Sequence, residues 1–433
     1  MAGLWLQVMP SLTAILDSLR SGDRAFLEEL QARFETVEPE LLAFLPEEGR
    51  FKRLHTEFGE LEKRFPAVEG RPALFGLPFG VKDIFRVDGF ETRAGSRLPA
   101  ASLAGQQAVG VSQLKQAGGL VLGKTVTTEF AYFAPGPTRN PHHPGHTPGG
   151  SSSGSAAAVS AGLAPLALGT QTIGSINRPA AFCGVVGFKP SFGRISTNGV
   201  IPLSPSLDTI GFFTQEVEAA RRIAPVLLED WRPNAAGDRP VLGVPTGPYL
   251  EQASSEGRDH LERGVGHLRR EGFRVIEVPA MPDYFEIAER HNRVLAAEAA
   301  EVHREWFTEF EPLYHPKTAE LIRRGRAVGP SELAAALEGR KKLRAELGRL
   351  MEQAGLDLWI SPSAVGPAPE SLESTGDPAM NLPWTHAGLP TLSLPTGRSP
   401  DGLPLGTQLI GKWQRDEQLL EHATILESIV GDG

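Results

Sequence analysis

Apolar residues near the start of the chain recur at the spacing of a helix. Leu12, Ile15, Leu16 and Leu19 lie three or four positions apart, and similar spacing continues downstream, so residues 11–70 are predicted to be helical. The chain contains no run of about eighteen apolar residues, so no membrane-spanning helix is expected.

A different pattern occupies residues 71–215. Gly, Ser, Pro and Thr dominate this segment, yet apolar runs such as Leu120–Leu122 and Val185–Phe188 are embedded in it. A flexible linker lacks such runs. The segment is therefore predicted to form short buried strands joined by tight loops, and loops of this kind often carry binding and catalytic groups.

Strands and helices alternate in the second half of the chain. The breaker-rich segment 231–240 predicts a boundary. After it, Val241–Val244 and Phe273–Val278 predict two strands on either side of a helix at Glu256–Arg270, which is the order of a βαβ unit. Residues 283–354 are predicted to be mainly helical.

Leu356–Ile360 then returns as a strand. Together these elements predict an α/β protein with a large mixed β-sheet core covered by helices on both faces. We expect one large domain with four parts. They are residues 1–70, a helical segment packed on the core; 71–215, the core itself; 216–355, a variable and mainly helical region; and 356–433, a segment that returns to the core.

Composition narrows the classes of function. Hydrophobic residues make up 40% of the chain and charged residues 22%, which is typical of globular proteins. The formal net charge of −9 argues against a general nucleic-acid-binding protein, which needs a basic surface. Cys183 is the single cysteine, so no disulfide can form within the chain, and a cytoplasmic location is expected. The apolar N-terminus lacks a basic leader and is interrupted by Pro10, which favours the start of the fold over a signal peptide.

Two short motifs invite functions that their surroundings disfavour. Residues 118–125 match the phosphate-loop pattern GxxxxGK[ST], but Leu120–Leu122 occupies the middle of the expected loop and predicts a strand there. Residues 150–154 match the GxSxG elbow around Ser152, but that elbow follows a strand directly, and the preceding segment 140–148 contains three prolines. His386 is the distant base that this second reading would need.

Histidine and cysteine spacing does not indicate a metal centre. His142, His143 and His146 lie on a Pro-rich loop without a carboxylate or cysteine companion, so they are interpreted as loop residues rather than ligands. Cys183 stands in the apolar segment Ala-Phe-Cys-Gly at 181–184, which favours a buried core position over a nucleophile. Neither a metal nor a cofactor is expected.

The most specific pattern lies in two neighbouring segments. Residues 149–159 read GGSSSGSAAAV and residues 169–175 read GTQTIGS. Upstream, Lys82 stands in the apolar stretch LPFGVKDIF. Lysine is rarely buried unless it is paired or functional, and an ion pair with Asp83 is the structural alternative.

These segments resemble the amidase signature family. The matches are PFGVKD around Lys82, GKT and TEFA within 123–131, PGGSSSGSAAAV at 148–159, GTQTIGSINRPAAFCGVVGFKPS at 169–191, and two further stretches within 387–411. The resemblance therefore covers roughly residues 70–215 and 356–413. Residues 216–355 match only in general layout.

The resemblance implies the amidase signature fold and a Ser-cisSer-Lys triad. The nucleophile falls on Ser175, the proton-relaying cis-serine on Ser151 and the base on Lys82. The family's oxyanion hole falls on the backbone N–H groups of Thr172, Ile173, Gly174 and Ser175. The chemistry agrees, because a serine hydroxyl needs a base to become a nucleophile, and burial lowers the pKa of a lysine so that it can be that base.

Three positions depart from the family pattern. The family commonly has Asp at the position of Gln171, Gly at Ile173 and Arg at Asn177, although Arg178 follows at once and can substitute. Ile173 still offers a backbone N–H, so the departures bear on substrate identity more than on the triad. An apolar pocket formed by Ile173, Phe182 or the region 216–355 would favour apolar or aryl acyl groups.

Three functions stay open from the sequence. The first is a free-standing amidase that cleaves amides and also esters or carbamates. The second is the amidase subunit of a tRNA-dependent amidotransferase, which the three departures and the dissimilar region 216–355 disfavour. The third is an inactive binding protein on the same fold, which the intact triad disfavours. The expected partners are a small-molecule amide or carbamate substrate and water, without nucleic acid, and the oligomeric state, a homodimer included, is not predicted.

Overall fold

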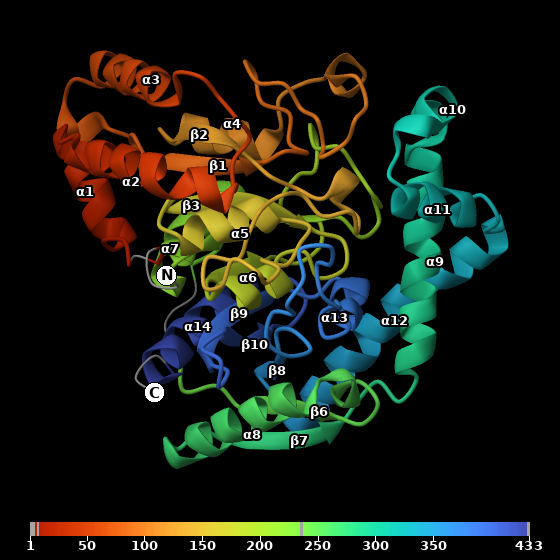
Figure 1. Cartoon of the computed structure of the whole chain (residues 1–433). Helices are drawn as coiled ribbons and strands as arrows, with labels where there is room; N and C mark the ends of the chain where they lie inside the picture. The colour runs from red at the N-terminus through yellow and green to blue at the C-terminus, as the bar shows by residue number, and fades with distance from the viewer. Residues whose placement is uncertain (1–4, 7, 234–236, 431–433) are drawn as a thin grey trace.

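The computed structural model describes residues 5, 6, 8–233 and 237–430 (Figure 1). Parts of the apolar N-terminus and of the predicted boundary at 231–240 lie outside the described residues. The strands are β1 Pro78–Lys82, β2 Leu120–Thr125, β3 Leu166–Gln171, β4 Val186–Lys189, β5 Thr209–Thr214, β6 Leu242–Thr246, β7 Val275–Pro279, β8 Leu358–Pro362, β9 Thr391–Arg398 and β10 Pro404–Ile410.

The helices lie around these strands and between them in sequence. They are α1 Leu12–Ser21, α2 Ala25–Leu41, α3 Arg50–Arg64, α4 Val109–Gln116, α5 Ser153–Ser160, α6 Asn177–Cys183, α7 Val217–Leu227, α8 Ser255–Arg270, α9 Tyr284–Val302, α10 Arg304–Phe310, α11 Pro316–Gly325, α12 Pro330–Ala354, α13 Leu382–Ala387 and α14 Asp416–Val430. Within the described part of the chain, no helix has the length and apolar character that a membrane crossing requires.

The described strands form one mixed sheet in the order β2-β1-β3-β5-β4-β9-β10-β8-β6-β7. Strands β1, β2 and β3 are parallel, β5, β4, β9, β10 and β8 pair antiparallel in turn, and β6 and β7 are parallel to β8. Helices α5 and α6 pack on one face, while α7, α8 and α14 cover the other (Figure 1). The predicted α/β class with a large mixed sheet is confirmed.

The predicted elements of the second half also appear. Strands β6 and β7 are adjacent and parallel with α8 between them in sequence, so the βαβ unit is confirmed. They form the far edge of the sheet, so the mainly helical region 216–355 also extends the core. Pro316 and Pro330 are the first residues of α11 and α12, where a missing N–H costs nothing.

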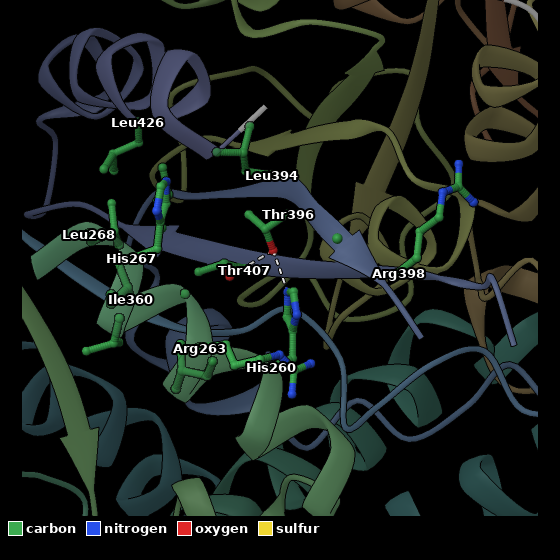
Figure 2. Close-up of a pocket in the computed structure, with 15 residues that line it drawn as sticks. His260, Arg263, His267, Leu268, Ile360, Leu394, Thr396, Arg398, Thr407 and Leu426 are labelled. Carbon is green, nitrogen blue, oxygen red and sulfur yellow. Dashed lines mark hydrogen bonds between the residues drawn. The ribbon is translucent and has the colours of Figure 1, made fainter. Parts of the chain in front are cut away.

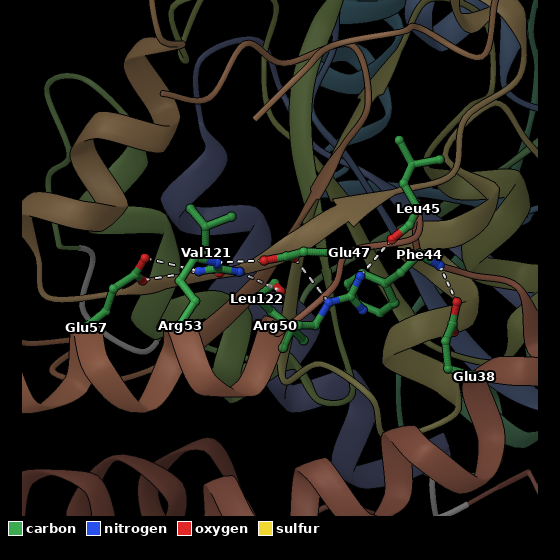
Figure 3. Close-up of polar contacts among 9 residues, drawn as sticks. All are labelled: Glu38, Phe44, Leu45, Glu47, Arg50, Arg53, Glu57, Val121 and Leu122. Carbon is green, nitrogen blue, oxygen red and sulfur yellow. Dashed lines mark hydrogen bonds and ion pairs between the residues drawn. The ribbon is translucent and has the colours of Figure 1, made fainter. Parts of the chain in front are cut away.

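The opposite edge strand, β2, is covered by the N-terminal helices. Arg53 of α3 donates to the backbone carbonyls of Val121 and Leu122, and Glu47 accepts from Arg53 Nε at 2.7 Å (Figure 3). Residues 43–45 add backbone hydrogen bonds along the same strand. An uncovered edge strand offers free N–H and C=O groups to other chains, so these contacts protect the sheet and fix the position of β1 beside it.

Candidate active site

Lys82 is the last residue of β1, between β2 and β3, and its side chain is fully buried. Its Nζ lies 2.7 Å from Ser151 Oγ and 2.8 Å from Thr170 Oγ1. The strands hold Lys82 and Thr170 in fixed positions because β1 and β3 are paired neighbours. The three side chains therefore meet at one end of the parallel part of the sheet.

Burial sets the protonation of this lysine. It lowers the pKa of Lys82 to about 7, and the nearby carboxylate of Asp208 opposes part of that shift. Desolvation disfavours the ammonium form, whereas a neighbouring negative charge favours it. Near neutral pH a substantial fraction of Lys82 is thus uncharged and able to accept a proton.

Asp83 is not the partner of Lys82. Its carboxylate forms a buried ion pair with Lys124 at 2.7 Å, so the pairing of Lys82 with Asp83 that the sequence allowed is wrong. This ion pair also shows what the lysine of the phosphate-loop match does. Lys124 stands inside strand β2, and Thr92 Oγ1 accepts a further hydrogen bond from it, so the segment forms no loop that could hold phosphate groups.

Ser151 precedes α5, and the peptide bond between Gly150 and Ser151 is cis. Small residues are needed here because a Cβ on Gly154 would lie 2.2 Å from the carbonyl oxygen of Ala43. Ser152 is buried beside β3, and its hydroxyl donates to the carbonyl of Thr170. The GxSxG match around Ser152 is therefore part of a packed turn, and Ser152 does not stand free as a nucleophile does.

Ser175 lies in the loop that connects β3 to α6. Its hydroxyl makes no hydrogen bond within the described residues, and the residue is 6% exposed. Gln171 holds the C-terminal end of the loop, because its Oε1 accepts hydrogen bonds from the N–H groups of Ile176 (2.8 Å) and Asn177 (3.0 Å). Thr385 of α13 holds the middle of the loop by donating a hydrogen bond to the carbonyl of Ile173 at 2.6 Å.

The four predicted oxyanion-hole donors lie in this same loop. No hydrogen bond within the described residues uses the N–H groups of Thr172, Ile173, Gly174 or Ser175 as donor. Most buried backbone N–H groups are paired, so a run of four without partners is unusual. These groups are available to a negatively charged oxygen bound beside Ser175.

The departures from the family pattern have structural partners. Gln171 caps the start of α6, and Asn177 Oδ1 accepts a hydrogen bond from Thr391. Arg178 is fully buried, and its Nη2 donates to the carbonyl of Gly150 at 2.7 Å. Arg178 therefore joins α6 to the segment that carries Ser151, and this contact brings the two serine-bearing segments together.

Sequence reasoning missed two polar residues at this site. Thr170 accepts from Lys82, and Asp208 Oδ1 accepts from Thr172 Oγ1 at 2.5 Å. Asp208 Oδ2 accepts from the backbone N–H groups of Leu203 and Ser204, and burial raises the pKa of Asp208 to about 6. The available signal was an acidic residue at the start of the apolar run 207–213, because a carboxylate is seldom buried without partners.

The remaining candidate residues have local roles. Cys183 is buried, and burial raises the pKa of its thiol, so the thiolate that a nucleophile needs is disfavoured. His142 Nε2 contacts the carbonyl of Cys183, and His146 Nδ1 contacts that of Ala368. No group of three metal-ligating side chains occurs in the described ranges. Phe182 packs in a small apolar cluster with three alanines.

Gly174 tolerates no side chain, which leads to a stability prediction. A Cβ at this position would lie 2.4 Å from Asn381 Oδ1, and Asn381 is held by hydrogen bonds from its Nδ2 to Ser363 and Gln408. Gly174→Ala is expected to cost about 1–3 kcal/mol of unfolding free energy through overpacking. It is also expected to lower kcat by displacing the loop 172–175. Urea unfolding and steady-state kinetics measure both effects.

The control for this prediction is a double-mutant cycle with Asn381→Ala. If the contact with Asn381 causes the loss, Gly174→Ala costs less in the Asn381→Ala protein than in the wild type. Equal costs in both proteins would show that the loss arises elsewhere.

Comparison with known proteins places the chain in a family. The family model described as Amidase matches residues 25–420. The glutamyl-tRNA(Gln) amidotransferase A subunit of Synechococcus sp. (strain RCC307) is 31% identical over 465 residues, covering 94% of each chain. The corresponding protein of Koribacter versatilis (strain Ellin345) is 32% identical over 406 residues, covering 82% of this chain and 85% of that one.

Solved structures agree with the sequence matches. A crystal structure of an amidase superimposes with a TM-score of 0.88 at 32% identity, covering 98% of this chain and 100% of the other. The peptide amidase of Stenotrophomonas maltophilia superimposes with a TM-score of 0.81 at 25% identity, covering 98% of this chain and 97% of the other. With a family model that spans most of its length and amidase structures that share its whole fold, the chain belongs to the Amidase family, the amidase signature enzymes, which are hydrolases of carbon–nitrogen bonds.

Proposed function

We propose that the protein hydrolyses amide-type C–N bonds of small molecules through an acyl-enzyme on Ser175, with Ser151 as proton relay and Lys82 as base. The observation that carries this proposal is the buried Lys82, whose Nζ lies 2.7 Å from Ser151 Oγ and whose pKa is lowered to about 7. A lysine with this pKa can both take and return a proton near neutral pH.

Acylation begins when Ser175 Oγ attacks the carbonyl carbon of the substrate. The Ser175 proton passes to Ser151 Oγ while the Ser151 proton passes to Lys82 Nζ. The carbonyl oxygen becomes an oxyanion, which we expect the unpaired N–H groups of residues 172–175 to stabilise. The C–N bond then breaks, and the leaving nitrogen takes a proton from Ser151, which Lys82 replaces.

Deacylation repeats the sequence with water as the nucleophile. Water attacks the Ser175 ester and gives up a proton through Ser151 to Lys82. The ester bond breaks, Ser175 Oγ recovers a proton by the same relay, and the carboxylic acid leaves. The cycle needs no cofactor or metal, because every proton is held by one of the three side chains.

Substrate preference is proposed from the loop that carries the donors. Ile173 replaces a common glycine and keeps a 7% exposed fraction beside Ser175, so apolar acyl groups are expected to be preferred over polar ones. Amides, aryl amides and carbamates (urethanes) share the same acyl chemistry. A polar amide such as glutamine proving the best substrate would contradict this preference.

The test is turnover of a small panel by the purified protein alone. The panel contains primary amides, aryl anilides, an aryl ester and a carbamate, and Ser175→Ala is the control. We expect hydrolysis of at least one amide, with kcat falling by about 10⁴-fold or more in the variant, since removal of a serine nucleophile has effects of this size. Turnover that survives in Ser175→Ala would remove Ser175 from its role.

A second candidate is the amidase subunit of a tRNA-dependent amidotransferase. The observation in its favour is the set of relatives bearing that name, with 31% identity over 94% of the chain in one case. If the protein is such a subunit, the isolated chain is expected to turn over none of the panel amides unless partner chains are present. The departures at Gln171, Ile173 and Asn177 favour the free-standing enzyme. An inactive binding protein is the third outcome, in which no partner restores turnover.

A further inference from the structure

A cavity of about 280 Å³ lies outside the candidate active site, between α8, α14 and strands β9 and β10. Figure 2 shows Leu268 and Leu426 on one side of it and Thr396 and Thr407 on the other. This volume is near the lower end for ligand pockets, so the cavity suits a small molecule.

The cavity lies on the face of the sheet opposite the active site. Side chains alternate between the two faces along a strand. Thr391 and Ser393 of β9 point toward α6 and its surroundings, where Thr391 donates to Asn177 and Ser393 to Ser363. Leu394 and Thr396 line the cavity, and Leu394 has the opposite direction to Ser393. The whole thickness of the sheet therefore separates the cavity from Ser175.

Its floor is apolar. Leu261, Val265 and Leu268 of α8 face Leu394 and Leu409 of the sheet, and all five side chains are buried or nearly so. A hydrocarbon group placed on this floor would be removed from water, which favours binding by about 25 cal/mol per Å² of apolar surface. The floor thus fits the tail of an amphipathic ligand.

Its rim is cationic. Arg263 is exposed and forms no ion pair or hydrogen bond within the described ranges. Arg398 points away from the cavity, where Gly402 accepts its hydrogen bond (Figure 2). None of the described lining residues is Asp or Glu, so an anion here meets no opposing carboxylate. A guanidinium beside an apolar floor matches a carboxylate head with a hydrocarbon tail.

Neutral polar groups lie between the rim and the floor. His260 Nε2 contacts Thr396 Oγ1 at 2.8 Å, and Thr396 and Thr407 are 3.1 Å apart. Burial lowers the pKa of His260, so it is expected to be uncharged near pH 7 and to act as a hydrogen-bonding group. These hydroxyls and the imidazole can share hydrogen bonds with a second carboxylate oxygen.

We propose that this cavity binds a short-chain amphipathic carboxylate, with the carboxylate at Arg263 and Thr396 and the hydrocarbon on the leucine floor. The proposal concerns binding alone and does not depend on the chemistry at Ser175. It is tested with octanoate as the probe and octylamine as the cation of the same tail length, both titrated calorimetrically into the whole protein.

Gly264 provides a variant that blocks the cavity. It lines the cavity within α8, and a Cβ there meets no atom within 4 Å, so Gly264→Leu is expected to fill the space without a clash. Gly266→Leu is the matched control on the same helix, since Gly266 does not line the cavity and a Cβ there meets only the flexible end of Arg270 at 3.6 Å. Leucine favours a helix more than glycine, so both variants are expected to fold.

We expect the wild type and Gly266→Leu to bind octanoate equally, and Gly264→Leu to lose at least tenfold in affinity. Arg263→Gln is expected to weaken octanoate several-fold. Octylamine is expected to bind more weakly than octanoate. Absence of octanoate binding at millimolar concentration, equal binding to Gly264→Leu, or a preference for octylamine would each overturn the proposal. A midpoint of urea unfolding in Gly264→Leu no lower than that of the wild type would show that the loss of binding is local.

Discussion

Replacing Lys82 with methionine is expected to lower kcat/KM by about a thousandfold or more near pH 7, because general base catalysis contributes effects of this order. Methionine suits the fully buried position in size and polarity. The variant leaves the hydroxyls of Ser151 and Thr170 without their partner, which is expected to cost about 1–3 kcal/mol of stability. The measurements are steady-state kinetics on the best panel substrate and urea unfolding.

The double variant Lys82→Met/Ser151→Ala separates a relay from two independent contributions. Residues that act as one catalytic unit have strongly non-additive effects. The double variant is therefore expected to be no slower than the slower of the two single variants. Multiplying losses would show that Lys82 and Ser151 act separately, and near-normal turnover by Lys82→Met would remove this lysine from the mechanism.

The three proposed catalytic side chains could be located from the sequence because each lies in a short motif that resembles the amidase signature family, and the resemblance assigned their roles. Lys82 stands out as a charge in an apolar stretch, and Ser151 and Ser175 lie in glycine-rich segments that have too many apolar neighbours for a linker. These motifs are short and local, so they can be recognised in a single sequence. Strand positions were predictable for the same reason, because apolar runs mark them directly.

The partners of these residues could not be predicted in the same way. Asp208 lies 36 positions from Thr172, from whose hydroxyl it accepts a hydrogen bond. Asp83 forms an ion pair with Lys124 on a neighbouring strand instead of with the adjacent Lys82. Such pairings depend on strand order, which hydrophobic periodicity does not encode. The contacts of Arg53 and residues 43–45 with strand β2 could not be predicted from the sequence for the same reason. Candidate catalytic residues are therefore easier to predict from the sequence than the residues that set their pKa values and positions.

The pH dependence of turnover is expected to report this tuning. Lys82 must be uncharged to act as base, and its pKa is lowered to about 7, so kcat/KM is expected to fall as the pH drops below about 7. Asp208 is ionised at neutral pH, since its own pKa is raised only to about 6. Its negative charge favours the ammonium form of Lys82 and therefore raises the pKa of that lysine.

Asp208→Asn is expected to move the acid limb of the kcat/KM profile to lower pH. The substitution removes the negative charge while keeping the shape of the side chain, so the ammonium form of Lys82 loses support and its pKa falls further. The plateau of kcat/KM is expected to drop about tenfold, because the amide cannot accept from Thr172 and from both N–H groups of residues 203 and 204 as the carboxylate does. A pH–rate profile from pH 5 to 9 measures both effects.

The matched control is Glu298→Gln. Glu298 of α9 accepts hydrogen bonds from Ser204 Oγ at 2.6 Å and from the N–H of Ser206 at 2.9 Å, so it holds the same loop as Asp208. It adds to the rise in the pKa of Asp208, but it is not among the charges that shift Lys82. Loosening the loop alone would lower the plateau in both variants and leave the acid limb in place. A shift of the acid limb confined to Asp208→Asn would therefore assign the effect to the charge beside Lys82, whereas an acid limb that stays in place in Asp208→Asn, or shifts equally in Glu298→Gln, would contradict that assignment.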